Sequence, residues 1–203
     1  MNGSELGEMV EQVIINDVKC KFRERQLVIE QLFSNYELLH RILLLNDKFI
    51  ECFNKGNKLI FCGNGGSAAD CQHIVAEFVV KLSKLRKSLS AISLTSNNSI
   101  ITAISNDIDY NTIFTRQLEG IAKPHDMLVG ISTSGNSQNI INSFEYAKQN
   151  EIFTISVTGN SENKLITIAD TSIIIPSQNT QIIQEIIMMI FHILCEMLDE
   201  VYD

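Results

Sequence analysis

The sequence lacks the marks of several broad protein classes. Its five cysteines form no Cys-x-x-Cys pair and are scattered at positions 20, 52, 62, 71 and 195. An odd, scattered set is typical of reduced thiols, which predicts a cytoplasmic protein without disulfides. No run of about 18 apolar residues occurs, so no membrane span is expected. The N-terminal residues carry acids where a secretory signal needs bases and an apolar stretch, so no leader is expected.

Positive charge is also scarce. The chain has 16 Lys and Arg against 24 Asp and Glu, which gives a formal net charge of −8 over 203 residues. Sequence-independent binding of nucleic acid requires a basic face, so we do not expect a nucleic-acid partner. Because 45% of the residues are hydrophobic, the chain can bury a sizeable core.

Glycine and proline are missing from most of the N-terminal quarter. Between Gly7 and Gly56 neither residue type occurs, and apolar residues recur there at helical spacing. This pattern predicts two long helices with a break near Ser34-Asn35. Residues 1–56 are therefore expected to form a helical arm of the same domain as residues 57–203. The arm either caps that domain or forms an oligomer contact.

From Lys58 onward, short apolar segments alternate with helical ones. Strands are expected at 58–62, 89–94, 127–131, 152–157 and 171–175, and helices near 68–84, 98–105, 112–122, 137–149, 163–169 and 180–202. The strand candidates are apolar with little alternation, as in parallel strands covered on both faces. The fold class predicted is α/β, a doubly wound five-stranded parallel sheet flanked by helices. Such sheets bind ligands at the carboxyl ends of their strands.

Two loops rich in glycine and serine follow strand candidates and precede helices. The first, GNGGS at residues 63–67, permits a tight turn, and Ser67 is expected as the helix N-cap. Free N–H groups and the helix dipole at such a terminus favour an anion. The second, STSGNS at 132–137, adds hydroxyl donors, and a third, TGNS at 158–161, follows the next strand. Neither of the first two ends in the Lys-Ser/Thr of a P-loop or has GxGxxG spacing, so we predict a small phosphorylated ligand rather than a nucleotide.

Acid–base groups occur on two of the helices. His73 and Glu77 share one face of the helix after GNGGS, although such pairs often lie on a solvated face. Residues 186–194 are apolar nearly all round and include His192, which could be a hydrogen-bonded core histidine. Gln184 precedes His192 by eight residues, about 80° round the helix and about 12 Å along it. The two reach one point only if their side chains lean together or belong to different subunits.

Four motifs carry a resemblance to a known family. The chain reads GNGGSxxxxxHxxxE from residue 63, SNDxxYNTIF at 105–114, ISTSGNS at 131–137 and QExxxxxxH at 184–192. Together they closely resemble the sugar isomerase (SIS) family, and within it the phosphoheptose isomerases, over nearly the whole chain. The resemblance implies an aldose–ketose isomerase that converts sedoheptulose 7-phosphate to D-glycero-D-manno-heptose 7-phosphate through an enediol. That reaction is the first step towards activated heptose for lipopolysaccharide or capsule.

The resemblance also implies roles for individual residues. Glu77 is the base and His192 the partner acid, and one zinc ion per subunit is surrounded by His73, Glu77, Gln184 and His192. The implied substrate-binding residues are Asn64, Gly65, Gly66, Ser67, Asn97, Ser132, Thr133, Ser134, Ser137, Thr180 and Gln184. Among these, the serines and threonines match positions that hold the phosphate, and Asn64 matches one on the sugar hydroxyls. The family is homotetrameric, with active sites built from more than one subunit.

The chain departs from the family pattern at two positions near this site. Asn97 stands where many relatives have Asp, and Lys81 stands where Arg is common. Residues 177–181 also lack the charged residue that some relatives carry. The sugar end of the pocket is therefore expected to differ.

Two other functions fit an SIS protein. One is a non-catalytic member that binds a protein partner such as a replication initiator, and the other is a phosphosugar sensor joined to a regulator. Because this chain keeps Glu77 and His192, an enzyme is favoured over a binding module. No DNA-binding segment is visible in the sequence, so the sensor ranks last.

Overall fold

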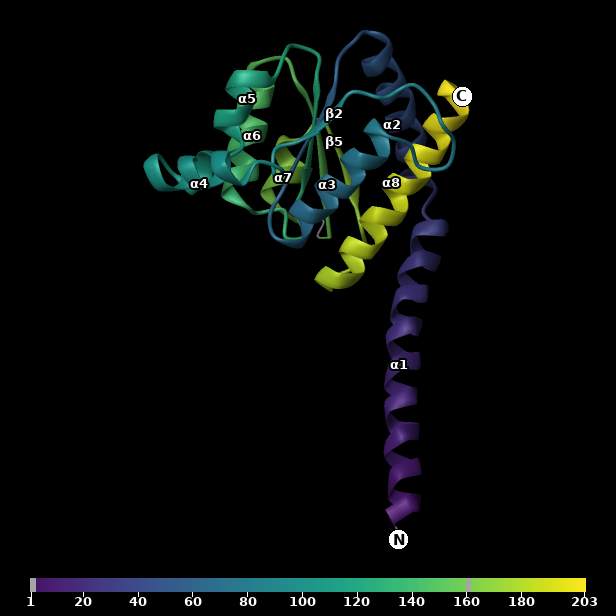
Figure 1. Ribbon diagram of the computed structural model, residues 1–203. Helices are drawn as coiled ribbons and strands as arrows, with labels where there is room; N and C mark the ends of the chain where they lie inside the picture. The colour runs from purple at the N-terminus through teal and green to yellow at the C-terminus, as the bar shows by residue number, and fades with distance from the viewer. Residues whose placement is uncertain (1–2, 160–161) are drawn as a thin grey trace.

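The computed structural model describes residues 3–159 and 162–203 (Figure 1). At its centre lies a five-stranded sheet in the order β2-β1-β3-β4-β5, with every neighbouring pair parallel. The strands are β1 (Leu59–Gly63), β2 (Ala91–Ser93), β3 (Met127–Ile131), β4 (Phe153–Thr158) and β5 (Thr171–Ile174). β2, β3 and β5 fall within the expected segments, β1 and β4 each end one residue later than expected, and the predicted parallel α/β sheet is confirmed.

Helices connect and cover the strands. They are α1 (Gly3–Phe33), α2 (Tyr36–Asn54), α3 (Gly66–Val79), α4 (Asn98–Asp107), α5 (Thr115–Ile121), α6 (Gln138–Gln149), α7 (Lys164–Ile168) and α8 (Thr180–Tyr202), with a short 3₁₀ turn at Tyr110–Thr112. The helix expected near 68–84 is shorter than predicted, because α3 ends at Val79. There the Arg86 side chain donates hydrogen bonds to the backbone carbonyls of Glu77 and Phe78. In a longer helix these carbonyls would accept hydrogen bonds from backbone N–H groups four residues later.

The sheet separates two hydrophobic layers. Leu59 and Phe61 of β1 face the layer formed by α2, α3 and α8, whereas Ile60 and Cys62 face the layer formed by α4, α5, α6 and α7. All four side chains are fully buried. Burial on both faces explains why the strand segments are apolar without alternation.

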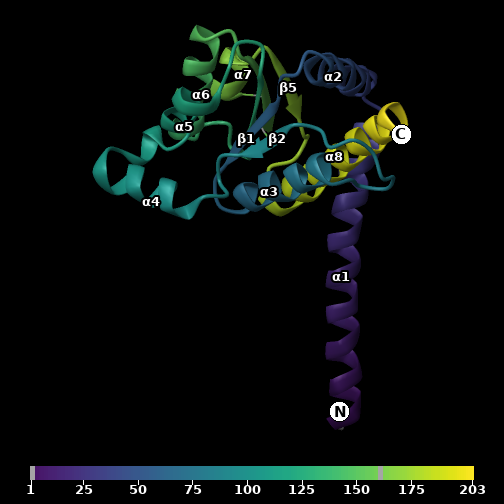
Figure 2. The same cartoon turned by 45° about the horizontal axis from the view of Figure 1, so that its top comes forward.

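The N-terminal arm consists of two helices with different surroundings. The break between them is where the sequence predicts it, and the Asn35 side chain accepts a hydrogen bond from the Leu38 N–H to start α2. α2 packs on the sheet, whereas α1 projects away from the rest of the molecule (Figures 1 and 2). Only the end of α1 is packed, through Val28 and Leu32, and residues 11–24 are exposed throughout.

The last helix lies across one face of the sheet, beside α3 (Figure 2). α8 is the one helix among the described residues that is long and apolar enough to cross a membrane, and half of its most apolar stretch is buried inside the fold. Its buried side chains, among them Ile187, Phe191 and Leu194, belong to the core layer shared with α2 and α3. We therefore interpret α8 as a helix of the protein core.

Candidate active site

The carboxyl ends of β1 and β3 mark the point where the chain order in the sheet reverses. From β1 the chain moves outward to β2, and it then returns to place β3 on the other side of β1. A crevice forms at such a switch point, and ligands of open α/β sheets bind there. The GNGGS loop follows β1 and the STSGNS loop follows β3, so both predicted anion loops border this crevice.

Direct hydrogen bonds join the two sides of the crevice. The side-chain amides of Asn64 and Asn139 exchange two hydrogen bonds of 2.9 Å, and Asn139 is nearly fully buried. The Tyr110 hydroxyl donates to the Asn64 carbonyl oxygen at 3.0 Å. The Asn64 side chain is therefore held in one orientation, and these bonds leave one of its amide hydrogens available to donate to a ligand.

The GNGGS loop turns sharply into α3. Gly65 has φ +58° and is the N-cap, so the prediction that Ser67 caps the helix is wrong. The positive φ that glycine tolerates lets the helix begin two residues earlier, and Ser67 becomes a buried residue of its first turn. A Cβ on Gly66 would lie 2.2 Å from the Gln184 side-chain nitrogen. The absence of that atom lets Gln184 of α8 reach the start of α3.

The STSGNS loop is tightly folded by its own polar groups. The Ser132 hydroxyl accepts a hydrogen bond from the Gly135 N–H at 3.1 Å and lies 3.2 Å from the Ser137 hydroxyl. Ser137 is the N-cap of α6 but does not use its side chain for capping. Ser134 is exposed and Thr133 half-buried. Hydroxyl groups of this loop thus lie next to the first N–H groups of α6, which is the kind of place where an anion binds.

The third predicted loop is only partly described. The Gly159 N–H donates to the Thr133 carbonyl at 3.1 Å, which brings the end of β4 against the STSGNS loop. Asn160 and Ser161 lie outside the described residues.

The acid–base residues meet between α3 and α8, which run side by side. His73 Nε2 lies 3.3 Å from Glu77 Oε1, and the rings of His73 and His192 are 5.3 Å apart between centroids. The fold therefore brings these three side chains together within a single chain. The His73 side chain is 54% exposed and that of Glu77 19%, so Glu77 is not on a fully solvated face.

The surroundings of His192 differ from those of a hydrogen-bonded core histidine. Its Nε2 atom is buried and has no hydrogen-bond partner. Asp70, one turn before His73, likewise has a buried Oδ2 atom without a partner, and burial raises the pKa of its carboxyl. Unsatisfied buried polar atoms are rare and point to a missing partner, such as a ligand or an ion.

The predicted ligand types suit a metal by their chemistry. Two imidazoles, a carboxylate and an amide oxygen would make a mixed N/O set of the kind that zinc accepts, although a Gln ligand is unusual. The structure groups His73, Glu77 and His192, whereas the Gln184 amide lies against Gly66. Within residues 3–159 and 162–203, however, no three His, Cys, Asp or Glu side chains stand close enough to form a metal site as they are. The free Nε2 of His192 is the observation that favours a metal here.

Other predicted substrate residues lie at helix starts. The Asn97 side chain accepts a hydrogen bond from the Ile100 N–H at 3.1 Å and so caps α4. Thr180 is the exposed first residue of α8, one turn before Gln184. Lys81 lies beyond the end of α3 and is exposed.

A cavity of about 410 Å³ opens beside the GNGGS loop. It extends from this loop to α4 and the 3₁₀ turn, and its polar lining includes Asn64, Gln72, Thr95 and Tyr110. Gln72 donates to the Thr95 carbonyl at 3.1 Å. Our sequence reasoning assigned no role to Gln72, Thr95 or Asn139, because no local pattern distinguishes them. Tyr110 stood inside the SNDxxYNTIF motif and could have been considered.

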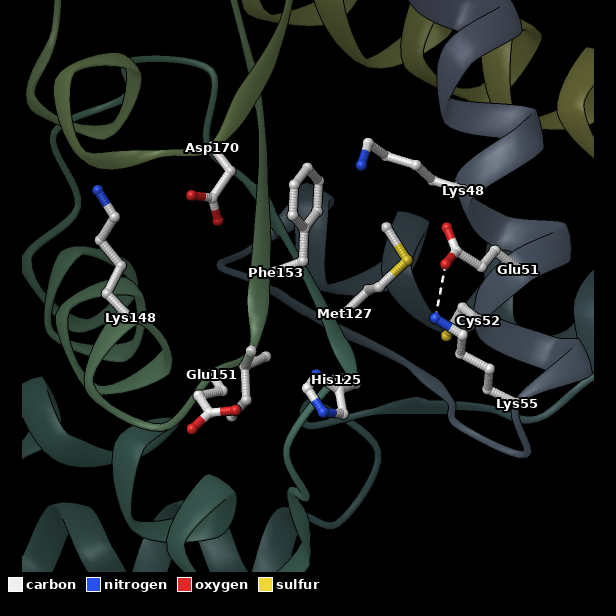
Figure 3. Close-up of a pocket in the computed structure, with 11 residues that line it drawn as sticks. Lys48, Glu51, Cys52, Lys55, His125, Met127, Lys148, Glu151, Phe153 and Asp170 are labelled. Atoms are coloured by element: carbon white, nitrogen blue, oxygen red, sulfur yellow. Dashed lines mark hydrogen bonds and ion pairs between the residues drawn. The ribbon is translucent and has the colours of Figure 1, made fainter.

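A second cavity, of about 400 Å³, lies at the opposite edge of the sheet (Figure 3). Its floor includes Met127 and Phe153, which begin β3 and β4, so it is far along both strands from the anion loops. Charges of both signs line it, and Glu51 pairs with Lys55 at 2.6 Å. The position and the balanced charge make this cavity a poor candidate for the phosphate site.

The cysteines near the site are not activated. Cys62 and Cys71 flank the GNGGS loop and are fully buried. Burial raises the pKa of Cys62 to about 12 and that of Cys71 well above its ordinary value. Neither thiol ionises readily, in keeping with the interpretation of ordinary buried thiols; Cys20, on α1, is exposed.

Comparison with known proteins places these features in context. Residues 27–159 match the family model described as SIS domain. A protein from Thermoplasma acidophilum named probable phosphoheptose isomerase is 48% identical over 162 residues, which are 80% of this chain and 89% of the relative. Two solved phosphoheptose isomerases, from Francisella tularensis and Neisseria gonorrhoeae, align with TM-scores of 0.86 and 0.85 and identities of 28% and 30%. Both alignments cover 92% of this chain, and 98% and 99% of those chains.

Proposed function

Since the chain belongs to the phosphoheptose isomerase family of SIS domain proteins and is an isomerase of sugar phosphates in heptose biosynthesis, we propose that its substrate is sedoheptulose 7-phosphate. The product is D-glycero-D-manno-heptose 7-phosphate. The observation that carries this proposal is the meeting of Glu77, His73 and His192 between α3 and α8, in a fold that places the GNGGS and STSGNS loops at the switch point of the sheet.

The proposed chemistry uses one carboxylate and one imidazole. Glu77 removes a proton from the carbon next to the ketone, which gives an enediol, and returns the proton to the neighbouring carbon. His192 moves a proton between the two oxygens, because imidazole gains and loses protons near neutral pH. His73, at 3.3 Å from the Glu77 carboxylate, orients that group.

The two loops hold the phosphate end of the substrate. Hydroxyl and N–H donors come from five residues of these loops: Ser67, Ser132, Thr133, Ser134 and Ser137. Thr180 adds a further donor from the start of α8. The N-terminus of α6 favours the phosphate charge. Asn64, fixed by Asn139 and Tyr110, contacts a sugar hydroxyl with its remaining amide hydrogen. Binding is thus separated from the proton transfers at Glu77.

Zinc is part of the proposal, with His73, Glu77, Gln184 and His192 as its ligands. When bound, zinc would polarise the substrate carbonyl and stabilise the developing oxyanion. The unpartnered Nε2 of His192 supports this ligand set.

The proposal extends to assembly and pathway. α1 carries exposed apolar side chains, including Val18, Phe22 and Phe33, which support the homotetramer implied by the family. The protein acts in the cytoplasm, in keeping with five free cysteines among the described residues. Its product feeds the synthesis of activated heptose for lipopolysaccharide or capsule.

The decisive experiment is turnover of sedoheptulose 7-phosphate by the purified protein, with and without added zinc. Glu77→Gln removes the base with little change of shape, and we expect kcat to fall by at least about 10²–10⁴-fold. Binding of the substrate, measured by calorimetry, should persist because the phosphate loops are intact.

Glu51→Gln is the matched control. Glu51 also lies on a helix and pairs with a residue four positions on, but it is on α2, far from the loops. Its substitution should leave kcat unchanged. A wild-type protein that binds the heptulose phosphate without converting it would contradict the proposed substrate and favour a binding role for an inherited site.

A further inference from the structure

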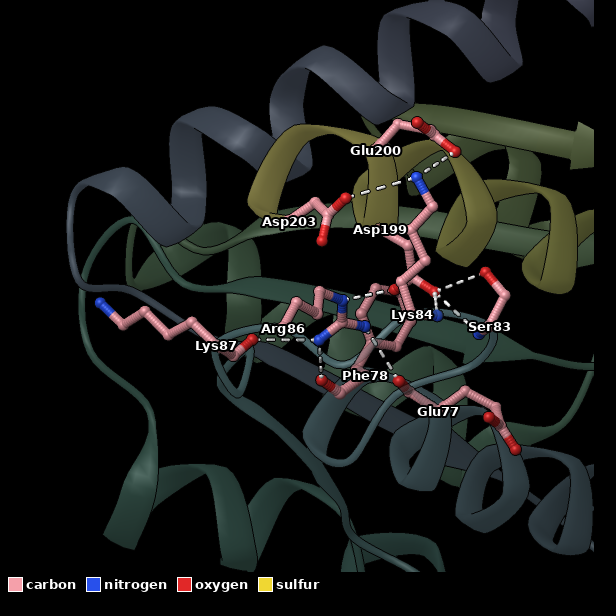
Figure 4. Close-up of polar contacts among 9 residues, drawn as sticks. All are labelled: Glu77, Phe78, Ser83, Lys84, Arg86, Lys87, Asp199, Glu200 and Asp203. Atoms are coloured by element: carbon pink, nitrogen blue, oxygen red, sulfur yellow. Dashed lines mark hydrogen bonds and ion pairs between the residues drawn. The ribbon is translucent and has the colours of Figure 1, made fainter.

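A buried ion pair joins the segment after α3 to α8 (Figure 4). The side chains of Arg86 and Asp199 form this pair, and both are completely buried. Burying two charges costs free energy that their attraction rarely exceeds, so such a pair is weak evidence for a gain in stability. Its position in the fold is more informative.

Arg86 binds the end of the helix that carries Glu77. Its guanidinium donates to the carbonyl of Glu77 at 3.0 Å and to that of Phe78 at 2.9 Å, and it also reaches the Lys87 carbonyl at 3.2 Å. Figure 4 shows the Glu77 carboxylate pointing away from this contact. Arg86 therefore holds the backbone of Glu77 and leaves its side chain free for the site.

Asp199 binds the same segment from the other side. One carboxylate oxygen pairs with Arg86, and the other accepts hydrogen bonds from the Ser83 N–H at 2.8 Å, the Ser83 hydroxyl at 3.0 Å and the Lys84 N–H at 3.1 Å. Asp199 follows His192 by seven residues, about 20° short of two full turns. The two side chains therefore share one face of α8.

The network thus connects the backbone of Glu77, through Arg86 and Asp199, to the helix that carries His192. We propose that Arg86 and Asp199 are positioning residues for the isomerisation, which fix Glu77 of α3 against His192 of α8. This inference rests on the proposed function, because it concerns the same two groups. Neither Arg86 nor Asp199 needs to touch the substrate.

The test uses two single variants. Arg86→Lys keeps the charge but cannot reach two carbonyls and the carboxylate with one planar fork. Asp199→Asn keeps the shape and loses the charge. Misplacement of a catalytic group by about 1 Å can cost about 10²-fold in rate, so we expect kcat to fall about 10- to 100-fold in both variants. KM should stay nearly constant, because the phosphate loops are remote from the pair.

Asp126→Asn is a matched control for loss of a buried carboxylate. Asp126 is also fully buried, pairs with Lys58 and accepts backbone N–H bonds from Lys58 and Lys123, but these partners lie in the segments before β1 and β3 and not on α3 or α8. Its variant should lose stability comparably and keep its kcat at temperatures where the protein is folded. A purely structural role for Asp199 predicts equal behaviour of the two variants.

A double variant, Arg86→Met with Asp199→Leu, guards against a folding failure, because apolar pairs often replace buried ion pairs without loss of stability. If it folds with native melting temperature and unchanged kcat, the proposal is overturned. Crystal structures add a reading independent of turnover: the 5.3 Å separation of the His73 and His192 rings should change in the variants. If the separation of the two rings is unchanged in the variants, the positioning role is overturned, even if the wild type acts on another sugar. If the wild type does not convert sedoheptulose 7-phosphate, that result alone contradicts the proposed substrate and not the positioning role.

Discussion

The residues around the His192 imidazole determine whether its ring nitrogens are hydrogen-bonded or free to bind a ligand. On an apolar helix it could have been an ordinary core histidine, with both nitrogens hydrogen-bonded. In the fold its Nε2 is buried without a partner, close to His73. Leaving such a group unpaired costs about 1–3 kcal/mol. A ligand that occupies this nitrogen removes the cost, so the site favours occupation.

Gly66 provides a test of the Gln184 position. In Gly66→Ala the new Cβ would lie 2.2 Å from the Gln184 side-chain nitrogen, so this flexible side chain must move. We expect zinc content, measured by mass spectrometry, and kcat both to fall several-fold. Gly120→Ala is the control, because nothing lies within 4 Å of its Cβ position on α5. Equal zinc content and kcat in the two variants would show that Gln184 is not needed at the site.

Asn97 is a position where the family resemblance led us to expect an Asp. Because its side chain caps α4, and Asn and Asp are about equally good N-caps, Asn97→Asp should leave the free energy of unfolding nearly unchanged. Asn97→Ala should lower it by about 1 kcal/mol. Urea denaturation of the three proteins measures both effects. A large gain of kcat in Asn97→Asp would instead assign a catalytic charge to this position.

At the scale of secondary structure, α3 and α8 behave as one unit. Three contacts along their length join them: Gly66 with Gln184, His73 with His192, and the Arg86–Asp199 network at the far end. The two helices run parallel, because the contacts follow in the same order along both. Their first turns are therefore directed to the same edge of the sheet as the anion loops.

The carboxylate at the end of this unit should make stability depend on pH. Burial alone would raise the pKa of Asp199, but hydrogen bonds from the N–H groups of Ser83 and Lys84, together with those from Arg86 and the Ser83 hydroxyl, hold it below its ordinary value. A carboxylate with a lowered native pKa stabilises the fold above its unfolded pKa, near 3.8, and loses this effect as the pH falls through the native pKa.

The comparison of wild type with Asp199→Asn measures this contribution. We expect the variant to be less stable by about 3–5 kcal/mol near neutral pH, because Arg86 is left buried without its partner. The difference in unfolding free energy should shrink below about pH 4, where the unfolded carboxylate takes up a proton. Guanidinium denaturation at several pH values gives the curve. A difference that grows as the pH falls would contradict the sign.

At the scale of the whole molecule, α1 is an arm that packs on the domain near its end, at Val28 and Leu32, while its described side chains from residue 11 to residue 24 are exposed. Its side chains at Ile14, Val18 and Phe22 are spaced by four, so they form one stripe, and they are 58%, 45% and 70% exposed. Figures 1 and 2 show the helix standing clear of the domain. A single helix gains most of its stability from burying an apolar face, which favours contact between copies of the chain.

Phe22→Glu tests this contact. A charge in the apolar stripe should dissociate the proposed tetramer, which sedimentation velocity would detect as a smaller species. Gln12→Glu adds the same charge to another exposed position on α1 and should leave the assembly intact. A monomer in the wild type, or equal assembly of both variants, would exclude α1 as the oligomer contact.

The secondary-structure elements of this protein follow from local patterns in its sequence. The spacing of apolar residues, together with glycine and serine, acts over a few positions along the chain. These local patterns predict the break near Ser34, the five strand segments and the loops at 63–67 and 132–137. Because parallel strands present their carboxyl ends at one edge, the sequence also placed both loops on the same side of the sheet. Where a contact crosses the chain, local prediction failed: α3 stops at Val79 because Arg86 takes its last carbonyls.

Which side chains from distant parts of the sequence come into contact depends on the tertiary fold. The amide pair of Asn64 and Asn139 joins residues 75 positions apart, and the ion pair of Arg86 and Asp199 joins residues 113 positions apart. Spacing along one helix could not tell which residues of α3 lie beside His192. Packing of α8 against α3 places His192 beside His73, because side-chain direction is fixed by the register between two helices, and that register depends on the whole core between them.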